Sequence, residues 1–126
     1  MRPVSLITSV LLVLVLSFTA LAAQEKTPQA GLTPAEEAGM RLLAMESKGL
    51  LKIMVGEPIT YMLVEPQNWK SLKPEKKEEL ARLALTLCQG FNQRGKNIDF
   101  VIIRDMTSRE TLGRAFIKDG RIKILK

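Results

Sequence analysis

The chain has 126 residues, a formal net charge of +6 and no histidine, and 46% of its residues are hydrophobic. Without histidine it cannot form a Ser-His or Cys-His nucleophilic pair or a histidine-based metal site. The length that remains after an apolar amino-terminal segment fits one small domain. We therefore expect a single-domain, non-enzymatic protein without a metal ion or cofactor.

The positive charge is concentrated in the last third of the chain. Residues 23–93 carry nine Lys and Arg against nine Asp and Glu, whereas residues 94–126 carry nine against four. In an exported protein, a basic surface favours anionic lipid headgroups, cell-wall polymers or acidic proteins as partners. Aromatic residues make up only 5% of the chain, which argues against nucleic-acid binding by base stacking.

The amino terminus has the pattern of an export signal. Arg2 precedes the uncharged run "VSLITSVLLVLVLSFTALAA", and Ala20 and Ala22 suit a cleavage site after Ala22. This predicts a signal peptide over residues 1–22 and a periplasmic or secreted protein. The run is also long enough to span a bilayer, so the alternative is an inner-membrane anchor over residues 4–23. A polar, aperiodic stretch over residues 23–32 predicts a flexible linker, followed by one domain over residues 33–126.

The first helix of the domain is predicted over residues 34–47. Thr33 suits the N-cap, Pro34 the first helical position, and Glu36 completes a capping box three residues after the cap. Gly49 readily takes the left-handed conformation that ends a helix. The helix is therefore marked at both ends.

A β-hairpin is predicted next. The stretch "LLKIMVGEPITYMLVE" contains two apolar runs broken at Gly56-Glu57-Pro58, which predicts strands over residues 50–55 and 59–64. In the second strand, alternate residues point to opposite faces. Neither face of that strand is strongly polar.

The longest helix is predicted over residues 74–93. Lys73 occupies its N-cap position, where Ser, Thr, Asp or Asn is preferred. Cys88 lies at the edge of the apolar stripe and is expected to be a small core residue, although in an oxidising compartment the alternative is a disulfide between two chains. The apolar stripe consists of Leu80, Leu83, Ala84, Leu87 and Phe91.

Trp69, the single tryptophan, lies just before this helix. We expect Asn68 to cap one helical turn that holds Trp69 and Leu72, so that the indole forms a lid over the helix and the end of the sheet. The alternative is an interaction platform for a ligand. The lid is favoured because no second aromatic residue lies close in sequence to complete a stacking site.

The last third of the chain predicts three strands. Residues 98–104 are rich in branched side chains on both faces, as in a central strand. A polar turn over 105–110 follows, and Asp119-Gly120 predicts a two-residue turn between strands 112–118 and 121–125. The order is therefore α-β-β-α-β-β-β, an α+β fold with a mainly antiparallel sheet of four to five strands and a long helix on one face.

The stretch "NWKSLKPEKKEELARLALTL" followed by "VIIRDMTSRETLGR" resembles small exported bacterial α+β proteins without a known activity. The shared features are a Trp-x-x-Leu helix entrance, a lysine in the first turn and an Asp turn between two strands, over roughly residues 50–126. The chain departs from that pattern with Ser108-Arg109 where a Thr-Gly or Ser-Gly tip is expected, and with Lys73 where Ser or Thr is more usual. The resemblance implies the fold and no activity.

The last hairpin is the most specific functional feature. A two-residue turn places Lys118 opposite Arg121, Phe116 opposite Lys123, and Arg114 opposite Leu125. Four cations then surround Phe116 on one face, which predicts an anion-binding patch with Phe116 as an interaction residue. The alternative is that the cations only guard an edge strand against aggregation. The candidate anion-binding residues are Arg114, Lys118, Arg121 and Lys123.

The central strands are apolar on both faces, and one long helix covers only one of them. Either the first helix covers the second face, giving a compact monomer, or a partner surface or a second copy does. We therefore expect an exported, non-enzymatic protein that acts through protein contacts, as a periplasmic interaction or assembly component. The alternative is an envelope-surface module whose basic hairpin binds anionic lipid or cell-wall polymer.

Overall fold

The computed structural model describes residues 32–126. The predicted signal peptide, its alternative as a membrane anchor, and the linker up to residue 31 lie outside the described residues. Within the described part, none of the helices combines the length and the apolar character that a membrane crossing requires.

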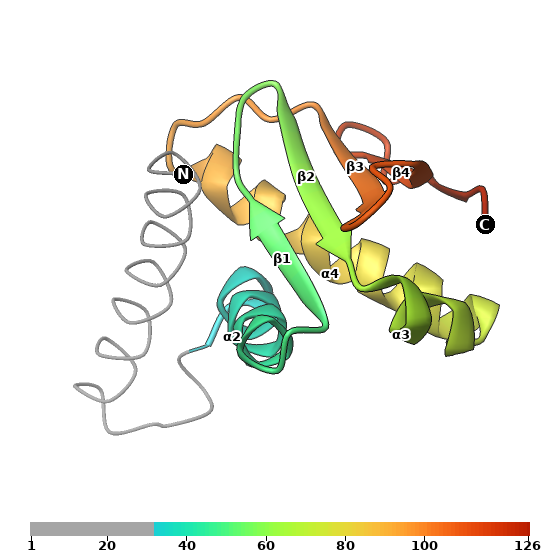
Figure 1. The fold of residues 1–126 in the computed structure, drawn as a ribbon. Helices are drawn as coiled ribbons and strands as arrows, with labels where there is room; N and C mark the ends of the chain where they lie inside the picture. Colours follow the sequence, from blue (N-terminus) through green and yellow to red (C-terminus); the bar gives the residue numbers. More distant parts are fainter. Residues whose placement is uncertain (1–31) are drawn as a thin grey trace.

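The described chain forms a five-stranded sheet with its helices packed against it (Figure 1). This confirms the predicted α+β class and the mainly antiparallel sheet, in which the strands follow the order β1-β2-β3-β4-β5. The elements are α2 (Pro34–Ser47), β1 (Leu51–Met54), β2 (Ile59–Val64), α3 (Pro66–Ser71), α4 (Pro74–Gln93), β3 (Phe100–Asp105), β4 (Thr111–Phe116) and β5 (Ile122–Ile124).

The two long helices begin and end where the sequence predicts. In α2, the Glu36 backbone N–H donates to Thr33 Oγ1 over 3.2 Å and the Thr33 N–H donates to the Glu36 carboxylate, so the capping box is complete. Gly49 follows α2 with a φ of 76°. Lys73 has N-cap geometry at α4 but makes no side-chain capping bond.

The short helix α3 differs from the prediction in its cap. The sequence suggests Asn68 as the cap of this turn, but the N-cap is Glu65, whose carboxylate accepts the backbone N–H groups of Gln67 and Asn68. Asn68 instead lies inside α3. Pro66 at the first helical position explains this, because its fixed φ favours a helix that begins there.

The middle of the sheet is a parallel pair. The chain leaves β2, passes through α3 and α4, and returns in β3 running in the same direction, with Tyr61 beside Ile102 and Met62 beside Ile103. Such a connection needs a long crossover, which the two helices supply. The other strand pairs are antiparallel.

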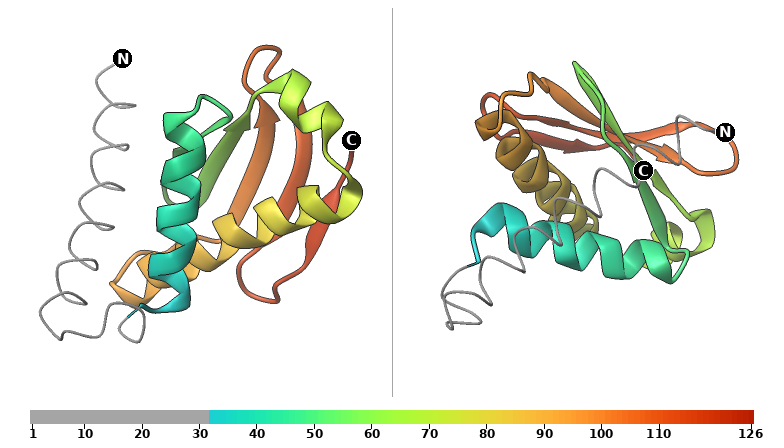
Figure 2. Two further views of the ribbon diagram at one scale, coloured as in Figure 1. Left: turned by 90° about the horizontal axis from the view of Figure 1, so that it is seen from below. Right: turned by 90° about the vertical axis from the view of Figure 1, so that its left-hand side faces the viewer.

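Both long helices pack on the same face of the sheet (Figure 2). The interpretation in which the first helix covers the second face is therefore wrong. A Cβ at Gly90 would overlap the Cβ of Ala35, so glycine at this position lets α2 lie close alongside α4. The first helix thus has its partner in α4 and never reaches the far side of the sheet.

The hydrophobic core lies between the helices and this one sheet face. Its sheet side is built by strand residues that point toward the helices, and they are almost completely buried. Leu42 from α2 and Leu87 from α4 close it from the other side, at 0% and 1% exposure. The fully buried strand residues are Ile53, Thr60, Met62, Val64, Val101, Ile103 and Ala115.

Candidate functional site: the open face of the sheet

Within residues 32–126, the face of the sheet that points away from α2 and α4 is not covered by any helix. Side chains alternate along each strand, so Thr60, Met62 and Val64 of β2 face the helices and their neighbours face away. We call the far side the open face. Its residues are Lys52, Met54, Ile59, Tyr61, Leu63, Phe100, Ile102, Arg104, Thr111, Arg114, Phe116 and Lys123, together with Arg121 just before β5.

An arginine and a tyrosine stack near the middle of the open face. The guanidinium carbon of Arg104 lies 4.6 Å from the ring centroid of Tyr61. The Nε of Arg104 is covered and has no hydrogen-bond partner in the described part of the chain. The guanidinium is therefore held by an aromatic ring, and no carboxylate among residues 32–126 forms an ion pair with it.

A second aromatic cluster lies toward the last hairpin. Phe100 and Phe116 are register partners on β3 and β4, and their rings meet edge to face with centroids 5.8 Å apart. The guanidinium carbon of Arg121 lies 4.8 Å from the centroid of Phe116. This geometry gives the hairpin end of the open face a pair of packed aromatic rings with a cation beside it.

Charge on the open face has one sign. Arg114 and Lys123 are exposed and lie directly opposite each other on β4 and β5. Like charges in this position repel each other and so favour a bound anion. Among the described strand residues that point away from the helices, Lys52, Arg104, Arg114 and Lys123 are cationic and none is acidic.

The predicted register of the last hairpin is wrong by two residues. Phe116 pairs with Arg121, and Arg114 pairs with Lys123, so the loop spans four residues, 117–120. The Asp119 carboxylate stabilises this longer loop by accepting the backbone N–H of Arg121 over 3.1 Å. A shift of two residues leaves the side chains that remain in the strands on their predicted face, because strand side chains alternate.

Three of the four predicted anion-binding residues therefore lie together, and one does not. Arg114, Arg121 and Lys123 share the open face beside Phe116, whereas Lys118 lies in the loop. Arg121 is also paired with Asp119, with 2.9 Å between Nε and Oδ2. The loop side holds a hollow of about 350 Å³ lined by Asp99, Phe100, Phe116, Lys118 and Asp119.

Trp69 lies away from the open face. The residue is only 2% exposed, and its Nε1 donates to the backbone oxygen of Lys126 over 2.9 Å. The ammonium of Lys77 lies 5.4 Å from the ring centroid. This is the arrangement of a lid over the core, and it leaves no accessible ring face for a ligand.

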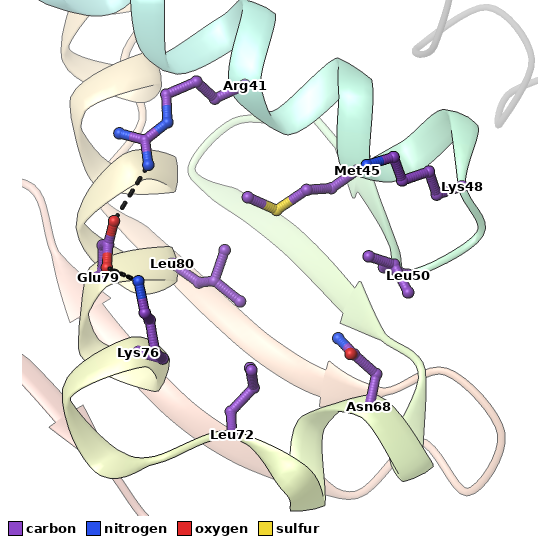
Figure 3. Close-up of a pocket in the computed structure, with 9 residues that line it drawn as sticks. All are labelled: Arg41, Met45, Lys48, Leu50, Asn68, Leu72, Lys76, Glu79 and Leu80. Carbon is purple, nitrogen blue, oxygen red and sulfur yellow. Dashed lines mark hydrogen bonds and ion pairs between the residues drawn. The ribbon is translucent and has the colours of Figure 1, made fainter.

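A groove of about 300 Å³ lies on the helix side, between α2 and the corner of α3 and α4 (Figure 3). Its apolar walls come from Met45, Leu50, Leu72 and Leu80, with Asn68 and Lys48 at one end. At the other end, the Glu79 carboxylate joins Arg41 at 3.1 Å and Lys76 at 3.3 Å. These ion pairs hold the pKa of Glu79 below its usual range. The groove's charges are thus largely paired with each other.

The cysteine offers little reactivity. Cys88 is completely buried, and burial raises the pKa of its thiol to about 11. A thiol in this state is neither a nucleophile nor available to a second chain. Within residues 32–126, acidic and cysteine side chains form no cluster of three that could hold a metal ion.

Comparison with protein-family models, curated proteins and solved structures finds no match to this chain. The open face is therefore interpreted from its own geometry.

Sequence reasoning identified the hairpin side of the open face and missed its middle. Tyr61, Phe100 and Arg104 are not among the site residues that the sequence predicts. They converge because β2 and β3 are parallel neighbours in the sheet. The sequence signal for this pairing was the predicted helix over residues 74–93 between the two strands, because two strands separated by a long helix usually form a parallel pair.

Proposed function

We propose that this is an exported, non-enzymatic protein that acts through contacts with another protein, and that the open face is its binding surface. The observation that carries the proposal is the placement of α2 and α4 on one side of the sheet. The other side is left with partly exposed Tyr61, Phe100, Ile102 and Phe116. Aromatic side chains and arginine are the residues most enriched at the centres of protein interfaces.

The chemistry of the chain supports a binding role over a catalytic one. It has no histidine, its one thiol is buried, and the Glu79 carboxylate is engaged in ion pairs on the helix side. Apart from Thr111, the strand residues of the open face are cations, aromatic rings and apolar side chains, and the carboxylate beside them, Asp119, is paired with Arg121. Such a surface recognises charge and shape.

Site-specific photo-crosslinking in the native host tests this proposal. A photoreactive phenylalanine analogue at Phe100 or Ile102 should form a covalent adduct with another protein. The control is the same analogue at Met40, which is 38% exposed on α2. The absence of an adduct from the open-face positions, or equal adducts from Met40, would contradict the proposal.

One observation favours a second candidate, an envelope-surface module that binds anionic lipid or cell-wall polymer. Arg114 and Lys123 form an exposed cationic pair, and each basic residue near an anionic surface contributes about 1 kcal/mol to attraction. In this case the protein should sediment with phosphatidylglycerol vesicles or cell-wall material at low salt. Charge reversal at Arg121 and Lys123 should abolish that association. If the unmodified protein does not sediment, this candidate fails.

A further inference from the structure

The cations of the open face specify the chemistry of its partner. We infer that the open face binds an acidic segment of a different protein, one in which carboxylates alternate with apolar side chains. This inference rests on the proposed function and adds the partner's class. It follows from the charge, the shape and the spacing of the open face.

Charge argues against a symmetric dimer in which two copies of this chain meet through their open faces. Two copies that met through the same face around a two-fold axis would place Arg104, Arg114 and Lys123 against an identical set. The described strands supply no carboxylate on that face to neutralise them. Like charges brought together at an interface cost several kcal/mol. A complementary occupant must carry negative charge.

Shape favours a protein segment over a membrane. Surfaces that enter a bilayer present projecting apolar side chains beside their cations. In the described part of the chain, the exposed large hydrophobic residues are Met40, on α2, and Leu125, which lies two residues after Lys123 and by strand alternation on the same side of the sheet. A single projecting apolar side chain at the end of β5 is less than a surface that enters a bilayer presents. The aromatic side chains of the open face are half-buried: Phe100 and Phe116 pack against each other, and Tyr61 packs against Arg104. Half-buried side chains of this kind suit a protein segment that lies across the strands.

The spacing of apolar and cationic residues on the open face predicts a partner in which apolar and acidic side chains alternate. Ile102 lies beside Tyr61 on one side and opposite Arg114 on the other. Arg104 lies two residues further along β3, stacked on Tyr61. An apolar side chain of the partner that packs on Ile102 would therefore have the guanidinium groups of Arg104 and Arg114 within reach, one on each side. Guanidinium groups bind carboxylates through paired hydrogen bonds, and an arginine already held against a ring loses less freedom on binding.

Titration with defined peptides tests the inference. One short peptide alternates Glu with Val, the second alternates Gln with Val, and the third alternates Glu with Ser. Binding is followed by NMR on isotope-labelled protein at moderate and at high salt. We expect the Glu-Val peptide to shift the signals of Tyr61, Arg104 and Arg114. We expect the other two peptides to bind at least about tenfold more weakly, because each lacks one of the two required features.

Two matched variants assign the effect to the open face. Arg114→Glu should weaken binding of the Glu-Val peptide by about tenfold or more. Lys96→Glu changes the net charge equally at an exposed loop position after α4 and should leave binding nearly unchanged. An equal loss in both variants would show that only net charge matters, and it would overturn the inference.

The remaining outcomes separate this inference from the proposed function. If the Gln-Val peptide binds as well as the Glu-Val peptide, the face binds protein without requiring acid, so the inference fails and the proposed function stands. If no peptide binds but phosphatidylglycerol vesicles do, the occupant is a lipid surface and the inference fails. If nothing binds, the inference fails and the crosslinking experiment alone decides the proposed function.

Discussion

The guanidinium of Arg104 lies over the ring of Tyr61, with 4.6 Å between the guanidinium carbon and the ring centroid. The two side chains come from β2 and β3, strands that the whole of α3 and α4 separates in sequence. Their contact depends on the parallel register, in which Arg104 pairs with Leu63, two residues along β2 from Tyr61. The pair is therefore a direct reporter of the register that builds the open face.

A double-mutant cycle should measure this contact. Tyr61→Leu and Arg104→Met each remove one partner and keep an apolar side chain. A partly exposed cation–aromatic pair contributes about 0.5–1 kcal/mol, so the two changes should be non-additive by that amount in the free energy of unfolding. Urea unfolding of the four proteins gives the result. Additive effects would show that the two side chains do not interact in solution.

The contact between α2 and α4 should tolerate no added methyl group. Gly90→Ala improves intrinsic helix propensity, yet its Cβ would overlap that of Ala35. Overpacking of this kind costs about 1–3 kcal/mol, so thermal stability should fall. Ala35→Gly in the Gly90→Ala background should recover most of the loss. An increase in stability from Gly90→Ala alone would contradict the close approach of the helices.

The start of α4 should be improved by a better cap. Lys73 has extended backbone geometry at the N-cap and no side-chain capping bond. Lys73→Ser should stabilise the protein by about 0.5–1 kcal/mol, because the hydroxyl can accept an unpaired N–H of the first turn. Lys73→Ala is the control, since it removes the lysine without adding a cap. Equal thermal midpoints for the Ser and Ala variants would count against the cap.

Trp69 should report the anchoring of the last residues. Its emission should be blue-shifted and poorly quenched by iodide, because the residue is almost completely buried. Deletion of Lys126 removes the backbone oxygen that accepts the indole N–H and should destabilise the protein by about 1 kcal/mol. Lys126→Ala keeps that oxygen and should preserve the emission spectrum. Identical spectra and stabilities for the deletion and for Lys126→Ala would refute this role of the bond.

The turn between β3 and β4 should make the free energy of unfolding depend on pH in the acidic range. The Ser108 and Thr107 backbone N–H groups donate to the Asp105 carboxylate and hold its pKa below the ordinary value. A lowered folded-state pKa means that the stabilisation is present above the unfolded-state value of about 3.9 and is lost as the pH falls through the folded-state pKa. Asp105→Asn should therefore lose stability at neutral pH and show a shallower further loss on acidification. Parallel pH profiles of urea midpoints for the two proteins would contradict this.

The helices could be predicted because their signals are local. Thr33 and Glu36 fix the start of α2 within one turn, and Pro74 does the same for α4. The fold class followed from the order of these elements. The cap of α3 was misassigned because two polar residues, Glu65 and Asn68, compete within three positions, and the proline between them decides the outcome.

The open face could be predicted only in part because long-range contacts build it. The cations of the last hairpin could be predicted. The predicted pairing of β4 with β5 was wrong by two residues, but a shift of that size keeps Arg114 and Lys123 on one face. The side on which α2 packs depends on Gly90 meeting Ala35, a contact between residues far apart in the chain. The meeting of Tyr61 with Arg104 likewise depends on β2 pairing with β3. Neither pairing leaves a mark in local periodicity.

Methionine oxidation of the isolated protein tests most directly whether the face opposite the helices is uncovered. Met54 points to the open face, Met62 points to the helices with 0% exposure, and Met40 is exposed on α2. Under mild peroxide, mass spectrometry should show Met40 and Met54 oxidised while Met62 stays intact until the protein unfolds. Protection of Met54 equal to that of Met62 would mean that the open face is covered in the isolated protein, and it would contradict the central claim that this face is free to bind a partner.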